Sequence, residues 1–379
     1  MKTTLKNTFF LIPILLLAAC YADDEGPDSI NRPTIVEVSY GNSSGRSIYI
    51  RWEDSLRNLP SYSLYRSEDN VNFSLLTDVH EKAYGDTNNL ISGKTYYYKV
   101  KGNYSPDLSS DFSDVDSGYI LQNYQFESTF GSLRYAYGIE FDNQDNIYVS
   151  DRTEGSINVY NSDYSFKKEL INTNSLIRGL CWSLDSNLIV VNSNGGGVFE
   201  VDIKSGTKTD HFVSKSEILR EVITDKQGNF YVSDVQNRDI IKLNSKWEFL
   251  KKWKMKQTTP SNNSSFYPSG LEYQDELIYI SGVNSNRYIE VYDSDGVFLR
   301  QFNFPYSASY ISQDAEGNFY YSCFTNRIVK TDKNGKLLAL IGNGKLERCR
   351  SVNVNSKGVV FATEENQPSK IFTFKKAGK

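Results

Sequence analysis

The sequence contains very little histidine and no closely spaced cysteine pair, and both shortages narrow its chemistry. Its 379 residues include two histidines, His80 and His211. A Ser-His-Asp triad and a histidine-based zinc site both place imidazoles at the reacting centre, so this scarcity argues against them. The four cysteines form no CxxC motif, which argues against a thiolate metal site. The sequence therefore predicts no resident metal and no cofactor.

The sequence also lacks a surplus of positive charge and any long apolar periodicity of helical type. Its 42 Lys and Arg residues are outnumbered by 46 Asp and Glu, which gives a net charge of −4. Nucleic-acid binding normally needs a concentrated basic surface, so no nucleic-acid partner is predicted. The chain is rich in strand-forming aromatics, with 27 Tyr and 21 Phe, and its 25 Gly supply turns. The composition predicts an all-β protein, and the length predicts two or three domains.

The first nineteen residues have the character of a cleaved export signal. Lys2 and Lys6 precede an apolar run at 9–17 that is too short to span a bilayer. The run ends in Leu-Ala-Ala-Cys at 17–20, which resembles the bacterial lipobox. The resemblance implies a signal peptide over 1–19, a diacylglycerol chain on Cys20 and attachment to a membrane. The alternative is an ordinary secretory signal followed by a chance cysteine.

The segment that follows the lipidated cysteine is short and acidic. Residues 20–32 include Asp-Asp-Glu at 23–25 and are predicted to form an unfolded tether. The stretch resembles the acidic surface-export signal of Bacteroidetes lipoproteins. This resemblance implies an outer-membrane protein displayed on the cell surface, and the periplasmic face of the same membrane is the alternative.

Residues 33–120 are predicted to form a β-sandwich. The segment resembles a fibronectin type III domain through a core Trp52 and a Leu-x-x-Gly-x-x-Tyr corner made by Leu90, Gly93 and Tyr96. Such a module implies a spacer, with a binding role as the alternative. Alternating strands separated by turn residues are expected at 33–40, 47–52, 62–66 and 89–100.

From residue 131 onward the chain repeats one pattern, which consists of a turn, a short β run and a polar residue that ends the run. The clearest copies are Asn-Ile-Tyr-Val-Ser-Asp at 146–151 and Asn-Phe-Tyr-Val-Ser-Asp at 229–234. The six copies begin at 146, 187, 229, 277, 318 and 359. Four strands for each copy, with two apolar faces to bury, suit a propeller blade. The copies resemble NHL repeats, which implies a six-bladed β-propeller over 121–379.

The last copy has no sequence for a fourth strand before the chain stops. A segment at about 122–130 looks like a terminal strand but precedes the first copy. We expect it to complete the last blade, because this joins the two ends of the ring and removes two exposed edges.

Aligning the copies just before their inner strands gives the best candidate for a binding site. These places hold Tyr137, Arg178, Arg220, Ser269, Ser309 and Arg350, and Arg134 and Tyr310 lie nearby in sequence. Guanidinium groups recognise carboxylate, phosphate or sulfate, and aromatic faces stack on sugar rings. The pattern predicts a channel rim that binds an acidic glycan, a polar peptide or a protein. The alternative is an internal salt-bridge lattice with Asp151, Asp234 and Glu364.

Two further features bear on chemistry in the ring. Glu140 and Glu272 occupy matching places in facing copies and could offer oxygen ligands to Ca²⁺, with hydrogen bonding between blades as the alternative. Cys323 and Cys349 are expected at the same end of neighbouring blades, where they either form a disulfide or stay as separate buried thiols.

These features favour a lipid-anchored binding or scaffold protein whose propeller face binds a glycan or protein partner. The rival is a propeller lyase or hydrolase on polysaccharide or lactone-type substrates, using Glu140, Glu272 or a metal. A third hypothesis is a pure assembly scaffold within an outer-membrane complex.

Overall fold

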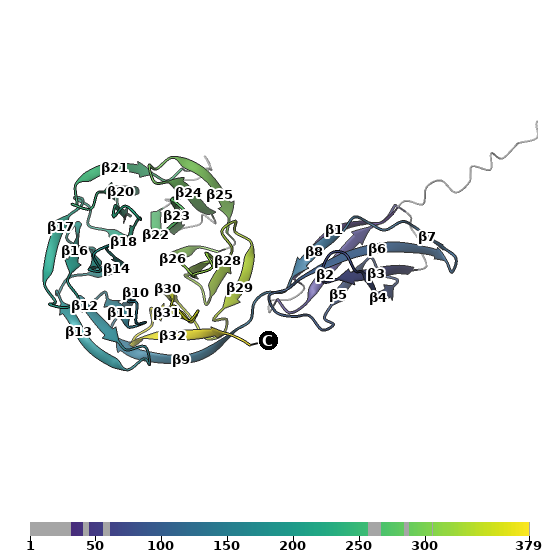
Figure 1. Ribbon diagram of the computed structural model, residues 1–379, viewed down its shortest axis with the longest axis horizontal. Helices are drawn as coiled ribbons and strands as arrows, with labels where there is room; N and C mark the ends of the chain where they lie inside the picture. Colours follow the sequence, from purple (N-terminus) through teal and green to yellow (C-terminus); the bar gives the residue numbers. More distant parts are fainter. Residues whose placement is uncertain are drawn as a thin grey trace, which may run out of the picture. The chain divides into compact units, whose positions relative to one another are not determined.

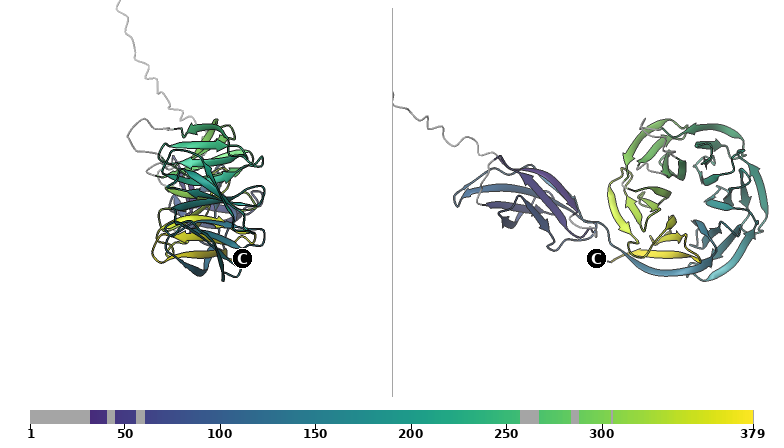
Figure 2. Two further views of the ribbon diagram at one scale, coloured as in Figure 1. Left: turned by 90° about the vertical axis from the view of Figure 1, so that its left-hand side faces the viewer. Right: turned by 180° about the vertical axis from the view of Figure 1, so that it is seen from behind.

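The computed structural model describes residues 32–40, 45–55, 61–256, 267–283, 288–304 and 306–378. Within these ranges the chain forms 32 β-strands and no α-helix (Figures 1 and 2), which confirms the predicted all-β class. None of the described residues therefore belongs to a helix that could cross a membrane. The predicted signal peptide (1–19) and Cys20 lie outside the described residues. Two compact units make up the chain, and the larger one includes Ser117–Lys379.

The N-terminal module consists of two β-sheets that share one core. Along its longest strand, β6 (Thr95–Ser105), every second residue is buried, and Tyr96, Tyr98 and Val100 are fully enclosed. Trp52 from one sheet packs edge-on against Tyr62 from the other, with ring centroids 5.6 Å apart. One sheet has β1 (Thr34–Tyr40), β2 (Ile48–Glu53) and β5 (Ala83–Asp86); the other has β4 (Ser74–Val79), β3 (Ser61–Ser67), β6 (Thr95–Ser105) and β7 (Leu108–Ser109), and β8 (Asp116–Tyr119) also pairs with β6.

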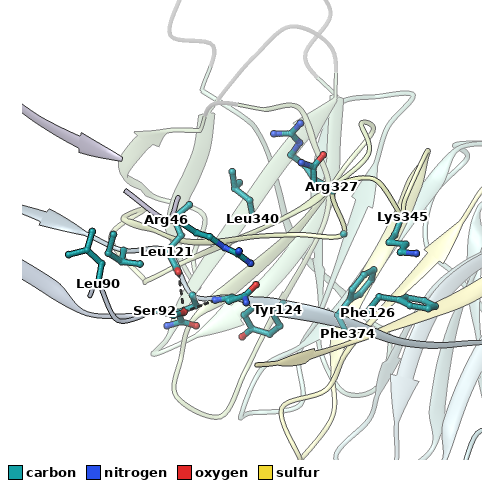
Figure 3. Close-up of a pocket in the computed structure, with 15 residues that line it drawn as sticks. Arg46, Leu90, Ser92, Leu121, Tyr124, Phe126, Arg327, Leu340, Lys345 and Phe374 are labelled. Carbon is teal, nitrogen blue, oxygen red and sulfur yellow. Dashed lines mark hydrogen bonds between the residues drawn. The ribbon is translucent and has the colours of Figure 1, made fainter. Parts of the chain in front are cut away.

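The loop before β6 is fixed by two side-chain hydroxyls. Tyr96 Oη accepts a hydrogen bond from the Ile91 amide at 2.8 Å. Ser92 Oγ donates to the Leu121 carbonyl at 3.2 Å and accepts from the Asn123 amide at 2.8 Å (Figure 3). These bonds tie the corner of the loop to the segment where the chain continues beyond β8.

The remaining strands form six four-stranded antiparallel sheets in the described part of the chain. The first strands of neighbouring sheets contact one another around the ring, and β10 also contacts β30. Five sheets follow chain order: β10 (Ala136–Phe141), β11 (Ile147–Asp151), β12 (Ser156–Tyr160), β13 (Phe166–Asn172); β14 (Ile177–Trp182), β15 (Leu188–Asn192), β16 (Gly197–Val201), β17 (Lys208–Phe212); β18 (Leu219–Thr224), β19 (Phe230–Asp234), β20 (Asp239–Leu243), β21 (Phe249–Lys254); β22 (Tyr267–Gln274), β23 (Leu277–Val283), β24 (Tyr288–Asp293), β25 (Phe298–Asn303); and β26 (Ala308–Gln313), β27 (Phe319–Cys323), β28 (Ile328–Thr331), β29 (Leu337–Ile341). The sixth sheet has the order β30 (Cys349–Val354), β31 (Val360–Glu364), β32 (Ser369–Lys376) and β9 (Tyr124–Leu133).

The sixth sheet confirms the predicted closing strand. β9 pairs antiparallel with β32, so that a strand preceding the first sheet completes the last one. Thr373 Oγ1 accepts from the Ser128 amide at 3.1 Å, and Phe126 packs edge-on against Phe374 at a centroid distance of 6.0 Å (Figure 3). The two ends of the ring are thereby joined by backbone pairing.

The turn between the first two strands of a sheet explains the Asn-x-Tyr part of the repeat. Asp142 Oδ1 accepts from the backbone amides of Gln144 and Asn146, each at 2.9 Å. Tyr148 Oη donates to the other carboxylate oxygen at 3.3 Å. The same roles are filled by Asp225, Asn229 and Tyr231 and by Asp314, Asn318 and Tyr320. Each acidic side chain thus organises its own turn, as Asp does in Asx-turns.

A hydroxyl in the second strand joins each of several sheets to the next. Ser150 Oγ accepts from the Gly138 amide at 2.8 Å and donates to the Arg178 carbonyl of the neighbouring sheet at 2.7 Å. Equivalent carbonyl contacts are made by Ser233 to Ser269, Ser322 to Arg350 and Thr363 to Tyr137. The serine or threonine of the repeat therefore holds the backbone at the start of the first strand of the neighbouring sheet.

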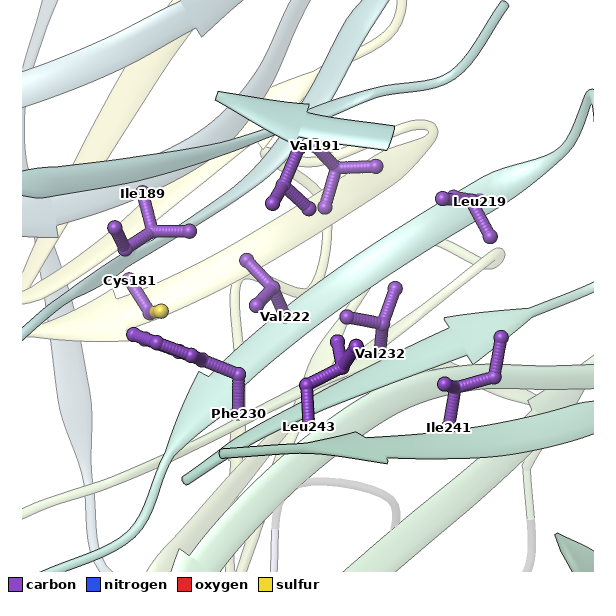
Figure 4. Close-up of a cluster of buried hydrophobic side chains, with 10 residues drawn as sticks. Cys181, Ile189, Val191, Leu219, Val222, Phe230, Val232, Ile241 and Leu243 are labelled. Carbon is purple, nitrogen blue, oxygen red and sulfur yellow. The ribbon is translucent and has the colours of Figure 1, made fainter. Parts of the chain in front are cut away.

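Apolar clusters fill every junction between neighbouring sheets. Figure 4 shows the junction of the second and third sheets, where Cys181 and Ile189 pack against Val222, Phe230 and Val232. A comparable cluster lies at each of the other five junctions, including the one between the sixth and first sheets. Burial of these side chains is the main source of stability, at about 25 cal/mol per Å² of apolar surface.

Of the two alternatives predicted for Cys323 and Cys349, the structure has the separate buried thiols and not the disulfide. Cys323 and Cys349 are fully buried, and the free thiol Cys181 is 8% exposed. Cys323 Sγ contacts the Tyr321 carbonyl at 3.8 Å, and Cys349 Sγ contacts the Ser351 carbonyl at 3.6 Å. Each thiol is directed to its own strand, and burial raises the pKa of both.

Candidate functional site

The first strand of each sheet contacts the first strands of its neighbours, and we call it the inner strand. A bulge in each inner strand determines which side chains face the central channel. In β14, Ile177 pairs with Asn192 while Leu180 pairs with Val190, so the inner strand carries one extra residue. Corresponding register shifts occur in β10, β18, β22, β26 and β30. Bulges re-aim side chains locally. This one brings residues at the start of each inner strand to the channel.

The six residues predicted for the rim are brought together, and we call them the channel mouth. Arg178 and Arg350 each lie 5.8 Å from the Tyr137 ring. Arg220 donates to Ser269 Oγ at 2.7 Å, and Ser269 Oγ donates to the Ser309 carbonyl at 2.7 Å. The channel mouth therefore consists of Tyr137, Arg178, Arg220, Ser269, Ser309 and Arg350.

Arg152 lies beside these six residues and is counted from here on as a seventh member of the channel mouth, although the sequence analysis missed it. Its guanidinium lies 5.1 Å from the Tyr135 ring, and its charge acts on Arg178. Arg152 directly follows the acidic stop of β11, a place where the repeat carries no recurring arginine. No pattern in the sequence therefore singled it out.

The arginines of the channel mouth have few anionic partners. Arg350 pairs with Glu365 at 2.7 Å and donates to Tyr135 Oη at 2.7 Å. In the part of the chain that the structure describes, Arg152, Arg178 and Arg220 have no carboxylate within ion-pair distance. The buried Nε atoms of all four arginines have no hydrogen-bond partner there: Arg152, Arg178, Arg220 and Arg350.

The positive charges of Arg152, Arg178, Arg220 and Arg350 repel one another. Arg178 is only 9% exposed. The pKa of Arg178 is lowered to about 10, mainly by burial, and the positive charges of Arg220, Arg152 and Arg350 contribute to the lowering. Unpaired buried donors and like-charge repulsion both cost free energy. An anion placed among these groups would relieve both.

The three acidic residues suggested as salt-bridge partners of the arginines accept hydrogen bonds from backbone amides and a serine hydroxyl instead. Asp151 accepts from the amides of Arg134 and Tyr135 at 2.6 and 3.1 Å. Asp234 accepts from Ser214 Oγ at 3.1 Å and from the Asn237 amide at 2.9 Å, and Glu364 accepts from the amides of Glu347 and Arg348. Among the described residues, none of these carboxylates pairs with an arginine of the channel mouth.

Arg134 and Tyr310 lie apart from the channel mouth. Arg134 is exposed and forms an ion pair with Glu154 at 3.0 Å. Tyr310 is buried deeper in the channel, where its hydroxyl donates to Glu221 Oε1 at 3.3 Å. Neither of these two predicted rim residues therefore belongs to the channel mouth.

Beyond Tyr310 the channel opens into a cavity of about 230 Å³, which we call the carboxyl chamber. Its lining includes Glu140 and Glu272, the two carboxylates suggested from the sequence, together with Glu221. Glu272 accepts from the Tyr273 amide at 3.0 Å and from Gln313 Nε2 at 3.1 Å. Its polar lining also includes Thr224, Ser312, Gln313 and Asn353.

All three glutamic acids of the chamber hold their protons more tightly than usual. Burial is the largest cause, and it raises the pKa of Glu272 to about 8. Burial also raises the pKa of Glu140 and Glu221 well above the usual range, with repulsion between the carboxylates adding to it. Charged forms in this cavity are disfavoured unless a cation balances them.

Glu221 was missed from the sequence although its neighbourhood carries a signal. It stands at the bulge position, which is glycine in β10, β14 and β22. A Cβ on Gly179 would collide with Glu221 Oε1. Glycine at that place in β14 is therefore required for the Glu221 side chain to fit.

The described residues include no group of three or more His, Cys, Asp or Glu side chains placed to hold a metal ion. The suggested Ca²⁺ ligands Glu140 and Glu272 are thus not joined by a third such ligand in that part of the chain.

Comparisons with known proteins identify the fold and leave the family open. No protein-family model and no curated protein matches the sequence. A gluconolactonase from Xanthomonas campestris is 13% identical, with a TM-score of 0.53, over 64% of this chain and 87% of its own. A structural genomics protein of unknown function from Bacteroides thetaiotaomicron is 12% identical, with a TM-score of 0.53, over 92% of this chain and 99% of its own.

A further neighbour is the β-propeller domain of Swd1 from Myceliophteria thermophila, 11% identical with a TM-score of 0.51, over 68% of this chain and all of that one. These likenesses show that the chain contains a β-propeller. Because proteins of different function share the fold, the site must carry any functional argument.

Proposed function

We propose that this protein is a lipid-anchored binding protein whose channel mouth holds an anionic group of a glycan or protein partner. The observation that carries the proposal is the set of four clustered arginines whose buried Nε donors have no partner among the described residues. Guanidinium groups bind carboxylate, sulfate and phosphate through paired hydrogen bonds. Tyr135 and Tyr137 add aromatic faces beside the arginines, which suits a sugar ring that bears the anion.

The proposed architecture is a six-bladed NHL-type propeller on a fibronectin type III-like spacer. Six four-stranded sheets and their closed cycle of inner-strand contacts support the propeller part. Trp52 in the core and the Tyr96 hydroxyl bond to the Ile91 amide support the spacer. Lipidation at Cys20, an acidic tether and display on the outer-membrane surface complete the proposal, and nucleic acid is not among the proposed partners.

The anion site is tested by removing three arginines together. The variant R178A/R220A/R350A is expected to lose at least a hundredfold in affinity for anionic ligands, or about 2.7 kcal/mol, because three of the guanidinium donors are gone. Binding is measured on an array that carries sulfated and uronic-acid oligosaccharides beside neutral ones. Inorganic sulfate should compete with the wild-type signal, and higher salt should weaken it.

Arg51→Ala serves as the matched control, because Arg51 lies in the N-terminal module and pairs with Glu37 and Glu53. Its array profile should equal that of the wild type. Thermal melting establishes that each variant is folded. Unchanged binding by a folded triple variant would remove the channel mouth as the binding site.

A propeller enzyme is the second candidate. It is favoured by the three carboxyl groups with raised pKa in the carboxyl chamber, since such groups serve as general acids near neutral pH. One fold neighbour is a gluconolactonase. Turnover of lactones or acidic polysaccharides by the wild type, lost in E140Q and E272Q but kept in the triple arginine variant, would establish this candidate in place of the first.

A further inference from the structure

The carboxyl chamber contains polar groups whose bonding capacity is unused. Glu221 is 1% exposed, and its Oε2 atom has no hydrogen-bond partner in the described structure. Ser312 is 3% exposed, and its Oγ atom is also unpartnered there. Both residues line the cavity. Unsatisfied buried oxygens of this kind cost free energy, and a ligand with N–H donors would satisfy them.

The chamber has no positive charge of its own. None of the described residues that line it is Lys, Arg or His, whereas three are glutamic acids. The titratable groups that face it are Glu140 from β10, Cys181 from β14, Glu221 from β18, Glu272 from β22 and Tyr310 from β26, and β30 contributes Asn353. All the titratable side chains are neutral or negative, so no lining charge repels a cation, and an ionised carboxylate in the chamber attracts one.

The size and walls of the chamber favour an organic cation over a metal ion. Its volume of about 230 Å³ exceeds the share of several water molecules, each about 30 Å³. The described carboxylates and thiols form no group that could hold a metal. The apolar part of the lining is small: Ile223 is 9% exposed, whereas the side chains of Leu180, Val222, Leu271 and Ile311 are buried between the sheets. A cavity of this size with three carboxyl groups and a small apolar patch at Ile223 matches an ammonium group on a short alkyl chain.

We infer that the carboxyl chamber is a second binding site, separate from the channel mouth, for a primary ammonium group carried on a short aliphatic chain. The ammonium donates to Glu221 Oε2 and Ser312 Oγ, and the alkyl part contacts Ile223. Lysine side chains, free amines and amino-bearing lipids or sugars share this chemistry.

Binding is coupled to loss of a proton from the chamber. Burial and mutual repulsion raise the pKa of the three carboxyl groups, so the empty chamber is largely protonated near neutral pH. When the ammonium enters, it stabilises an ionised carboxylate, and the carboxyl proton passes to solvent. Affinity should therefore rise as the pH rises from 5.5 to 8.

The inference is tested by calorimetric titration of the purified full-length protein with n-butylamine at pH 8. One site with saturable binding is expected, at least tenfold weaker at pH 5.5, with proton release visible when buffers of different ionisation enthalpy are compared. The neutral analogue n-butanol should bind at least tenfold more weakly than the amine. E221Q keeps the side-chain volume and should weaken amine binding at least tenfold, and S312A should weaken it less.

Two controls make the result specific. E169Q removes an exposed carboxylate of β13 and should leave amine binding unchanged. Inorganic sulfate, the competitor used for the channel mouth, should also leave it unchanged, which separates this site from the channel mouth. Thermal melting establishes that every variant is folded. Equal binding of n-butanol, undiminished amine binding in folded E221Q and E272Q variants, or displacement of the amine by stoichiometric Ca²⁺ would each overturn the inference.

Discussion

Replacing Lys330 with alanine is expected to lower the unfolding free energy by about 3–5 kcal/mol, because it leaves a buried carboxylate without its counter-ion. Lys330 Nζ lies 3.0 Å from Asp314 Oδ2, and the two side chains are 6% and 4% exposed. The same ammonium donates to Tyr124 Oη of the closing strand at 3.2 Å, and Tyr124 Oη lies 3.0 Å from Tyr320 Oη. The substitution therefore also weakens the attachment of β9. Urea denaturation followed by tryptophan fluorescence measures the loss.

The matched control is Lys242→Ala. Lys242 stands opposite Tyr231 as Lys330 stands opposite Tyr320. Its ion-pair partner Asp295 is 75% exposed, and its main bond is to the Ser294 carbonyl at 2.8 Å. We expect a loss of about 1–2 kcal/mol there. Equal losses in the two variants would show that the buried pair adds nothing beyond packing.

The unfolding free energy should fall as the pH rises from 5 to 8, and the variant E272Q should flatten this dependence. The folded-state pKa of Glu272 is about 8, whereas its ordinary value is 4.5. A group whose pKa is raised on folding contributes stability that is complete below its unfolded pKa and is lost as pH rises through its folded pKa. Between pH 5 and 8 the wild type should lose about 2–4 kcal/mol more than E272Q, at about 1.4 kcal/mol per pKa unit.

The experiment is urea denaturation at half-unit steps of pH. E169Q is the control, since this carboxylate is exposed on an outer strand. Its pH dependence should overlay that of the wild type. Parallel curves for the wild type and E272Q would mean that the Glu272 carboxyl ionises in the folded protein as it does in water.

Much of the fold was predictable because its rules are local. The residues of the repeated Asn-x-Tyr-x-Ser motif make hydrogen bonds within one turn or to the adjoining sheet, as at Asp142 and Ser150. Such bonds leave the same residue types at the same spacing in each copy. The closing strand followed from counting strands in the last copy, since an incomplete sheet must find its edge elsewhere.

The contents of the channel were less predictable because they depend on contacts across the ring. Glu221 and Tyr310 lie 89 positions apart and meet only when the ring is complete. Alignment of the copies brought out Arg178, Arg220 and Arg350 because all three are the second residue of an inner strand. It could not show that Arg152 joins them, or that the Cys323 and Cys349 thiols are directed to their own strands.

The pairing of β9 with β32 also constrains the order in which the protein acquires its structure. Ser128 and Thr373 lie 245 positions apart, so β9 is synthesised long before its partner. At about 5–20 residues per second, β9 waits about 10–50 s for β32 to emerge. During that interval the edge of β9 is unpaired and open to wrong partners. Pairing of β32 is thus the step that closes the ring, and deleting its 8 residues should be far more harmful to folding than the small size of the deletion suggests.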